Sequence, residues 1–337
     1  MHNFLFNSME VEKQDEWKLR NKMKLKMLLC MTLAVLLLTA CGLKQGQSDN
    51  AGQILHTFTD DLGREVNTGE IERVAVMIGS FADVWCLAGG RDTIVAAADD
   101  SWTSFELELN ENTADLGAVK TPSLEVLLAS RPDLVIASCN TVSNLELEEI
   151  LDKAGIPAAY FDVQSFDDYL HMLKICTDLT GCPENYERYG TEVAKAVEAA
   201  VSRQDGSSPR ILCMRATGSS CKIKGSRDFL LGEMLAELGC VNVADGGSTA
   251  LEELSLEAIM DADPDYVFCV LQGADSSAAM DTLEKTLLSN PAWSSLRAVR
   301  NGNFYTLEHS LYNLKPNARW GEAYEKLADI LYPEEAG

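Results

Sequence analysis

The chain reads Ser123-Leu-Glu-Val-Leu-Leu-Ala-Ser-Arg-Pro-Asp-Leu-Val-Ile136 and, later, Ser255-Leu-Glu-Ala-Ile-Met-Asp-Ala-Asp-Pro-Asp-Tyr-Val-Phe268. The two stretches align without a gap and share six of fourteen residues. In each, a serine is placed to cap a helix, Pro-Asp forms a turn and an apolar strand follows. Two independent helix–turn–strand units that obey the same local rules are one explanation. An internal repeat is the better one, because Ser-Leu-Glu and Pro-Asp recur in one register.

Short apolar runs alternate with helical segments on both sides of each copy. In the first half, strands are expected at residues 73–78, 93–98, 134–137 and 158–161, with helices at 81–88, 124–130 and 145–154. In the second half, strands are expected at 210–214, 241–244, 266–270 and 303–306, with helices at 228–238 and 319–331. This alternation is typical of parallel sheets covered by helices on both faces.

The segment between the halves, residues 183–204, is rich in helix formers and contains a single glycine, Gly190. It predicts one long α-helix. We therefore expect an α/β protein with two Rossmann-like lobes, residues 55–182 and 205–333, whose parallel sheets are joined by that helix. Ligands of open parallel sheets bind beyond the carboxyl ends of the strands, so a ligand cleft is expected between the lobes.

The N-terminus has the pattern of an export signal. A basic stretch precedes an apolar run that is shorter than the ~20 residues of a membrane-spanning helix. The sequence Leu38-Thr-Ala-Cys-Gly42 then resembles the lipobox of bacterial lipoproteins. We expect residues 1–40 to be a signal peptide with a misassigned extension ahead of Met23. Residues 41–54 would form a tether lipidated at Cys41, although a chance Ala-Cys after an ordinary signal peptide is the alternative.

The charge balance excludes one class of partner. The first 40 residues contain six of the 28 Lys and Arg and four of the 52 Asp and Glu, so the remainder has a net charge of −26. Such a surface repels nucleic acid and anionic lipid head groups. We therefore expect no nucleic-acid partner, and membrane attachment only through the acyl anchor.

Cysteine and histidine give little sign of a metal site. Eight cysteines follow Cys41, without a C-x-x-C pair or a Cys/His cluster at metal-binding spacing. The sequence does not decide whether a disulfide such as Cys176–Cys182 forms. The histidines beyond residue 40 are His56, His171 and His309. A Zn or Mn site built from several histidines is poorly supported. His309, in an expected cleft loop, is a weak candidate for an axial haem ligand.

Over roughly residues 55–333 the chain resembles the substrate-binding lipoproteins of ABC importers for iron-siderophores, haem and cobalamin. The strongest parts are residues 73–82, 116–138, 255–270 and 317–333. The resemblance implies a receptor, not an enzyme, that captures an iron chelate, haem or corrinoid-type ligand and delivers it to an ABC permease and its ATPase. It implies no intrinsic cofactor, a transported ligand that contains iron or cobalt, and a lipid-anchored location on the extracytoplasmic face of the cell membrane.

Two glutamates occupy equivalent positions of the repeat, Glu125 and Glu257. The resemblance implies that one glutamate on each lobe docks onto arginines of the permease. Partly desolvated, bidentate pairs of this kind would register the lobes over a pseudo-symmetric pore. A carboxylate in the first turn also meets the positive end of the helix dipole, and the two explanations are compatible.

Ligand contacts are expected in the strand-to-helix loops that face the cleft. The candidates are Trp102, Lys120, Asn140, Arg215, Lys222 and Tyr312. Trp102 lies in an acidic loop, where packing against its own lobe is the alternative. Arg215 suits an anionic ligand or a surface salt bridge, and Tyr312 would ligate haem iron or stack on a macrocycle. Trp320 lies at helical spacing with Tyr324, which favours core packing.

Two other classes of function stay open. An exported hydrolase on a two-domain α/β scaffold would need acid and base groups, for which the pairs Asp60/Asp61 and Asp99/Asp100 are available. Each pair is adjacent in sequence and is more typical of a turn than of a spaced catalytic pair. A ligand sensor that signals to a membrane partner without transport is the third possibility.

Overall fold

The computed structural model describes residues 54–227, 229–247, 251, 254–273 and 276–333. The lipidation at Cys41, the signal peptide and the tether up to residue 53 therefore lie outside the described residues. A small antiparallel hairpin, β1 (His56–Thr59) and β2 (Glu65–Thr68), opens the described chain. It agrees with the alternation of apolar and polar residues in this stretch.

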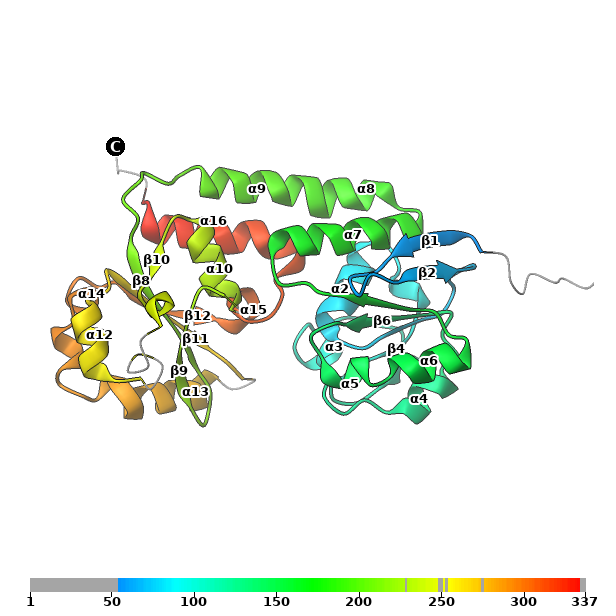
Figure 1. Cartoon of the computed structure of the whole chain (residues 1–337), viewed down its shortest axis with the longest axis horizontal. Helices are drawn as coiled ribbons and strands as arrows, with labels where there is room; N and C mark the ends of the chain where they lie inside the picture. The colour runs from blue at the N-terminus through cyan, green and yellow to red at the C-terminus, as the bar shows by residue number, and fades with distance from the viewer. Residues whose placement is uncertain (1–53, 228, 248–250, 252–253, 274–275, 334–337) are drawn as a thin grey trace, which may run out of the picture. The chain divides into compact units, whose positions relative to one another are not determined.

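The first lobe contains a five-stranded parallel sheet in the order β5-β4-β3-β6-β7; β4 and β6 of this sheet are labelled in Figure 1. Its strands are β3 (Val74–Val76), β4 (Ile94–Ala97), β5 (Ala114–Asp115), β6 (Leu134–Ser138) and β7 (Ala158–Phe161). The helices of this lobe are α2 (Gly79–Leu87), η1 (Arg91–Thr93), α3 (Asp100–Thr103), α4 (Leu124–Ala129), α5 (Val142–Leu145), α6 (Glu148–Ala154) and α7 (Phe166–Thr180). Because the chain starts in the middle strand and winds outward in both directions, the expected Rossmann-like arrangement is confirmed.

The second lobe repeats this plan with one change. Four parallel strands lie in the order β10-β8-β11-β12, and β9 (Cys221–Lys224) pairs antiparallel with β8. The parallel strands are β8 (Arg210–Ala216), β10 (Val241–Asn242), β11 (Tyr266–Leu271) and β12 (Phe304–Glu308). The helical segments are α10 (Leu230–Glu237), η3 (Val243–Gly246), α12 (Leu256–Ala262), α13 (Ser276–Leu283), η4 (Glu284–Leu288), η5 (Trp293–Ser295), α14 (Arg297–Arg300), α15 (His309–Tyr312), η6 (Asn317–Arg319) and α16 (Trp320–Leu331).

The two copies of the repeat have the same structure. The helices α4 and α12 begin at equivalent residues, and so do the strands β6 and β11. Ser123 Oγ accepts from the Val126 amide, and Ser255 Oγ accepts from the Ala258 amide. The residues before the two prolines, Arg131 and Asp263, both have positive φ, 47° and 39°. Equal caps and equal turns favour the internal repeat over two unrelated units.

The segment that joins the lobes is helical from Pro183 to Val201, but it is not one regular α-helix. It consists of α8 (Pro183–Tyr186), a π-helical segment η2 (Glu187–Thr191) and α9 (Glu192–Val201). The expected extension to residue 204 is wrong, because a turn follows Val201. A π segment widens the helix locally, and Gly190, buried inside it, packs against Tyr186.

Helix α16 packs alongside α9, and the two run together along the top of Figure 1. Gly321 makes this close approach possible, since a Cβ there would lie 2.7 Å from the Cβ of Ala196. Trp320 is 1% exposed and packs its ring against those of Phe166 and Tyr324. The prediction that Trp320 belongs to the core is confirmed.

The eight cysteines that the structure describes are all free thiols, so the disulfide left open between Cys176 and Cys182 is not formed. Cys213 and Cys269 are fully buried in β8 and β11, and burial raises the pKa of the Cys213 thiol. They are packing residues, as their apolar sequence context predicts.

Candidate ligand-binding site

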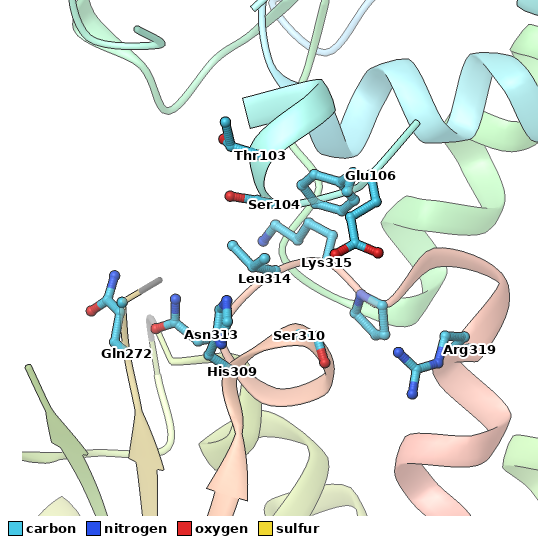
Figure 2. A pocket seen from close by; sticks show the side chains of 13 residues that line it. Thr103, Ser104, Glu106, Gln272, His309, Ser310, Asn313, Leu314, Lys315 and Arg319 are labelled. Carbon is cyan, nitrogen blue, oxygen red and sulfur yellow. The ribbon is translucent and has the colours of Figure 1, made fainter. Parts of the chain in front are cut away.

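A cavity of about 650 Å³ is lined by residues of both lobes (Figure 2). The first lobe contributes the turn after α3, and the second lobe contributes the ends of β11 and β12 with the chain that follows them. The lining residues are Thr103, Ser104, Phe105, Glu106, Gln272, Gly273, His309, Ser310, Asn313, Leu314, Lys315, Pro316 and Arg319. The volume suits a small-molecule ligand, and the position beyond the carboxyl ends of parallel strands is the one that the sequence predicts.

Lys315 is the central cation of this cavity. Figure 2 shows it between the turn that carries Ser104 and the segment that carries His309. Burial lowers the pKa of the Lys315 ammonium, while nearby carboxylates, Glu233 first among them, act in the opposite direction. Within the described residues, the Lys315 ammonium has neither a hydrogen bond nor an ion pair. It is therefore a desolvated charge without a direct counter-ion.

A second hollow of about 130 Å³ adjoins the first, because Asn313 and Lys315 line both. Arg215 contributes to its wall from β8, together with Glu233 and Gln164. The side chains of Lys315 and Arg215 thus face one small polar space together with the carboxylate of Glu233. Two cations against one carboxylate favour an oxygen-rich anionic group.

The remaining cation of the cavity, Arg319, is engaged within the protein. It donates to both carboxylate oxygens of Glu322, at 2.6 and 2.9 Å, and lies 3.8 Å from Glu308. Its hydrogen bonds to Glu322, with a further contact from Lys326, hold the pKa of the Glu322 carboxyl well below its usual range, at about 2. His309 is half-buried and lines the cavity at the start of α15, where its ring is available to a ligand.

The first-lobe rim of the cavity is fastened to α2. The Gly79 amide donates to Asp100 Oδ1 at 2.8 Å, and a Cβ at Gly79 would lie 2.7 Å from the Ser101 nitrogen. Burial raises the pKa of the Asp100 carboxyl to about 6, although the Gly79 amide opposes this shift. Asp100 therefore anchors the turn that presents Ser104 and Phe105 to the cavity.

Asn317 links the two lobes beside the cavity. Asn317, at the start of η6, donates through Nδ2 to the Ser80 carbonyl at 2.8 Å and to the Asp83 carboxylate at 2.9 Å. Its backbone has a φ of 50°, a conformation that asparagine tolerates better than most residues. Burial raises the pKa of the Asp83 carboxyl, and the Asn317 amide opposes this shift.

The candidate residues do not all gather at the cavity. Arg215 lines the smaller hollow and His309 the larger one. Trp102 is half-buried and packs against the core of its own lobe, as the alternative explanation holds. Three other candidates are exposed and line neither hollow: Lys120, Asn140, which donates to Asp162, and Lys222, on β9.

Tyr312, expected to contact the ligand, lines neither hollow. Its side chain is 1% exposed, and its hydroxyl donates to the Ala323 carbonyl at 3.1 Å. The short helix α15 turns Tyr312 into the core. The next segment of chain turns Lys315 into the cavity instead.

Sequence reasoning missed Lys315, Phe105 and Glu106. Phe105 and Glu106 follow the candidate Trp102 by three and four residues, and Lys315 follows the candidate Tyr312 by three. A signal was available in Lys315-Pro316, where a charged residue directly precedes a proline between the last strand and the last helix.

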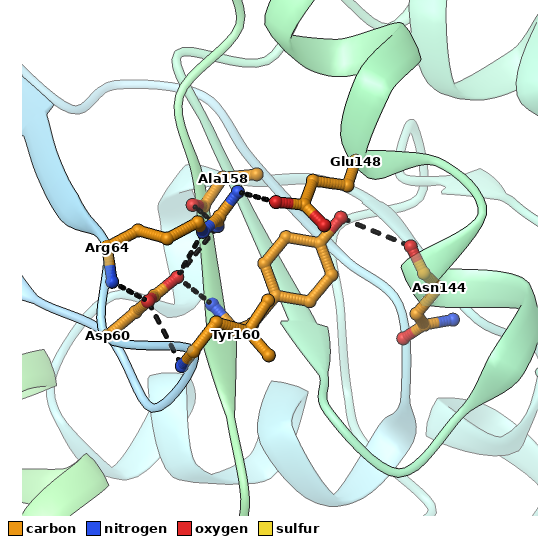
Figure 3. Close-up of polar contacts among 7 residues, drawn as sticks. Asp60, Arg64, Asn144, Glu148, Ala158 and Tyr160 are labelled. Carbon is orange, nitrogen blue, oxygen red and sulfur yellow. Dashed lines mark hydrogen bonds and ion pairs between the residues drawn. The ribbon is translucent and has the colours of Figure 1, made fainter.

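Asp60 and Asp61, the first of the two carboxylate pairs considered for a hydrolase, have structural roles. Asp60 is 3% exposed and accepts hydrogen bonds from the Arg64 guanidinium and from the Tyr160 amide (Figure 3). Arg64 also pairs with Glu148, and its guanidinium lies 4.6 Å from the centre of the Tyr160 ring. Asp61 accepts from the Asp162 amide. These contacts fasten the hairpin to β7 and leave no carboxylate of this pair free for acid–base work.

Glu125 and Glu257 lie in the first turns of α4 and α12, and both are exposed. Neither forms an ion pair with another residue in the part of the chain that the structure describes. Beside Glu125 is a shallow hollow of about 470 Å³ with an apolar lining that includes Val95, Ala114 and Val126.

The described residues contain no group of three or more His, Cys, Asp or Glu side chains arranged to hold a metal ion. Among the same residues, no helix combines the length and apolar character needed to cross a membrane.

A protein-family model described as Periplasmic binding protein matches residues 74–311, well over half of the chain. The chain belongs to this family. The resemblance found from the sequence is therefore confirmed, and so is the expected class of function, a substrate-binding protein of an ABC uptake system. Nothing in the comparisons supports the hydrolase alternative.

Two relatives in sequence and one solved structure show the extent of the similarity. The Fe(3+)-citrate-binding protein YfmC of Bacillus subtilis is 25% identical over 292 residues, which cover 84% of this chain and 88% of the relative. The high-affinity heme uptake system protein IsdE of Staphylococcus aureus is 20% identical over 231 residues, which cover 66% of this chain and 76% of the relative. The crystal structure of the TroA-like periplasmic binding protein FepB from Veillonella parvula superposes with a TM-score of 0.67 at 18% identity, covering 84% and 91% of the two chains.

Proposed function

We propose that this protein is the lipid-anchored extracytoplasmic receptor of an ABC importer and that it captures an anionic ferric chelate in the cavity around Lys315. The observation that carries the ligand class is the desolvated Lys315 ammonium, with Arg215 on the adjoining wall. A buried charge without a counter-ion is costly, and an anionic ligand supplies the missing partner. The iron-citrate relative supports a carboxylate-rich chelate.

Haem is the second candidate, and His309 is the observation in its favour. The ring is half-buried, lines the cavity and is free to ligate iron. Haem propionates would meet Lys315 in the same way as a chelate carboxylate. A corrinoid would bring cobalt instead, and the cavity offers no feature that selects it.

A ligand panel with one charge variant tests the proposal. The full chain, purified from membranes of the expression host, is titrated with ferric citrate, carboxylate siderophores, haem and cobalamin, with thermal shift and absorbance as readouts. A ligand at 100 times its Kd stabilises the folded state by about 2.7 kcal/mol. An anionic ferric chelate is expected to bind. A response to cobalamin alone, or to none of these ligands, would contradict the proposal.

Lys315→Met keeps the apolar stem of the side chain and removes the charge. It should weaken binding of the ferric chelate by about tenfold or more, which is the range for losing one member of a desolvated charge pair. Lys285→Met is the matched control, because Lys285 is exposed in η4 of the same lobe and lines neither hollow. Equal effects of the two variants would show that overall charge, and not Lys315, attracts the ligand.

Membrane attachment and docking complete the proposed role, which requires no catalysis. Cys41 would carry the acyl anchor, so Cys41→Ala should move the protein from the membrane fraction to the soluble fraction. Glu125 and Glu257 would meet arginines of the permease, which is powered by an ATPase. The double variant Glu125→Gln, Glu257→Gln should abolish uptake while leaving ligand affinity unchanged; normal uptake would rule out this docking mode.

A further inference from the structure

The helices that carry Glu125 and Glu257 are held in the two lobes by the same set of contacts. Arg73 donates to the Ser130 carbonyl at the end of α4, and Arg210 donates to the equivalent Ala262 carbonyl at the end of α12. The carbonyls of the same two arginines accept from the amides of Asp133 and Asp265, both at 2.7 Å. Each helix therefore has a serine cap at one end and an arginine at the other, which fixes its outer face.

That outer face carries a second repeated feature, an exposed apolar side chain. Leu128 is 37% exposed and Met260 is 36% exposed, and they occupy equivalent positions of the repeat. The residues just before them, Leu127 and Ile259, are fully buried. The core therefore receives Leu127 and Ile259, and the next residue of each helix points to solvent.

Each apolar side chain lies on the same face as a glutamate. Residues three positions apart are neighbours on a helix surface, so Leu128 stands beside Glu125 and Met260 beside Glu257. In Figure 1 both helices lie away from α9 and α16. A single exposed leucine needs no explanation. A carboxylate beside an exposed apolar side chain at the same position of both lobes is different, because nothing in the fold itself requires it.

We propose that Leu128 and Met260 are apolar contacts to the permease and that the docking surface consists of two equal pairs, Glu125–Leu128 and Glu257–Met260. The partner is then a permease dimer in which each half carries a cationic side chain beside an apolar hollow. Neither glutamate has an ion-pair partner among the described residues, so both carboxylates are available to such cations. This inference rests on the proposed receptor function and assigns residues to its partner surface.

The two members of each pair have different physical roles. The carboxylate steers and orients the encounter, an effect that salt screens. The apolar side chain contributes by leaving water when the complex forms, which salt affects much less than an ion pair and which mainly slows dissociation. Met260 in place of a leucine suits an irregular hollow, because methionine adapts its shape.

The test measures binding of the full chain to its permease–ATPase complex, reconstituted in lipid nanodiscs, as a function of salt. The double variant Leu128→Gln, Met260→Gln should raise the Kd by roughly tenfold or more, through faster dissociation and to a similar extent at low and high salt. The double variant Glu125→Gln, Glu257→Gln should slow association mainly at low salt. Exchanging the two apolar residues, Leu128→Met with Met260→Leu, should retain binding.

The matched control is Ile150→Gln with Val241→Thr. These residues are 36% and 50% exposed, one in each lobe, and lie outside the two pairs. The inference is overturned if the control weakens binding as much as the test variant does. It is also overturned if only the glutamate variant weakens binding, a result that leaves the proposed receptor role intact. If neither double variant changes binding, both the inference and the glutamate docking fail, whereas ligand affinity still tests the receptor role separately.

Discussion

Asp100 shows how one side chain joins the fold to the ligand site. Its carboxylate accepts from the Gly79 amide and so holds the turn that contributes Ser104 and Phe105 to the cavity. Burial raises its pKa to about 6, above the value of an unfolded Asp, near 3.9. The folded state therefore binds this proton more tightly than the unfolded chain does.

The sign of the pH effect follows from that difference. The stabilising contribution of protonated Asp100 is fully present below about pH 4 and is lost as the pH rises through about 6. Asp100→Asn keeps an acceptor for the Gly79 amide and removes the titration. Relative to the wild type, the variant should gain on the order of 1 kcal/mol between pH 4 and pH 7, after allowance for solvent screening. Urea denaturation across this range measures the difference.

Asp92→Asn, at an exposed position of the same lobe, is the control for the loss of one carboxylate charge. A constant difference in stability between Asp100→Asn and the wild type from pH 4 to pH 7 would contradict the assignment of the titration to Asp100.

At the scale of elements, Gly321→Ala at the contact between α9 and α16 has two opposing effects on stability, a gain in helix propensity and a loss from overpacking. In an open helix, replacing Gly by Ala stabilises by about 1 kcal/mol. At Gly321 the new Cβ would lie 2.7 Å from the Cβ of Ala196, and overpacking of this kind costs about 1–3 kcal/mol. Gly321→Ala should therefore lower the free energy of unfolding, as measured by denaturant titration.

Two further variants separate packing from propensity. Adding Ala196→Gly to Gly321→Ala removes the close contact and should restore much of the lost stability. Gly246→Ala, at an exposed position with open space around its Cβ, should cause no comparable loss. A Gly321→Ala protein that is as stable as the wild type would show that the helices separate at little cost.

At the scale of the whole molecule, Asn317 links the lobes through Ser80 and Asp83. Asn317→Gly tolerates the positive φ and removes only the side chain, so it leaves the Ser80 carbonyl and the Asp83 carboxylate without their donor. Loss of such a partner costs about 1–3 kcal/mol, which corresponds to a fall in Tm of a few degrees for a chain of this size. Asn317→Ala should lose more, because the left-handed backbone becomes strained.

The pH dependence of Asn317→Gly provides an independent check. Asp83 loses the donor that opposes the rise in its pKa. A carboxyl whose pKa is raised in the folded state lowers the stability of the protein as the pH increases. The loss of stability in the variant, relative to the wild type, should therefore be larger at pH 7 than at pH 4. Calorimetry at the two pH values measures this difference. An unchanged Tm at both would exclude Asn317 as a link between the lobes.

How far sequence could predict the site is shown by Tyr312 and Lys315, three residues apart. Both lie between the last strand and the last helix, a segment without periodicity. Tyr312 was expected at the ligand, but it packs into the core and donates to Ala323. Lys315 was passed over, but it lies in the cavity. Local pattern does not decide which way an irregular segment turns its side chains.

The sequence by itself determined the α/β class, the two similar lobes, the family and the equivalent glutamates, because alternating apolar runs, serine caps and Pro-Asp turns act over a few residues. Tertiary structure alone decided which side chains share the cavity. Phe105 and Lys315 come from different lobes and line one cavity only because the lobes face each other. It also decided that Leu127 and Ile259 are buried while Leu128 and Met260 are exposed, since burial depends on the sheet against which each helix packs.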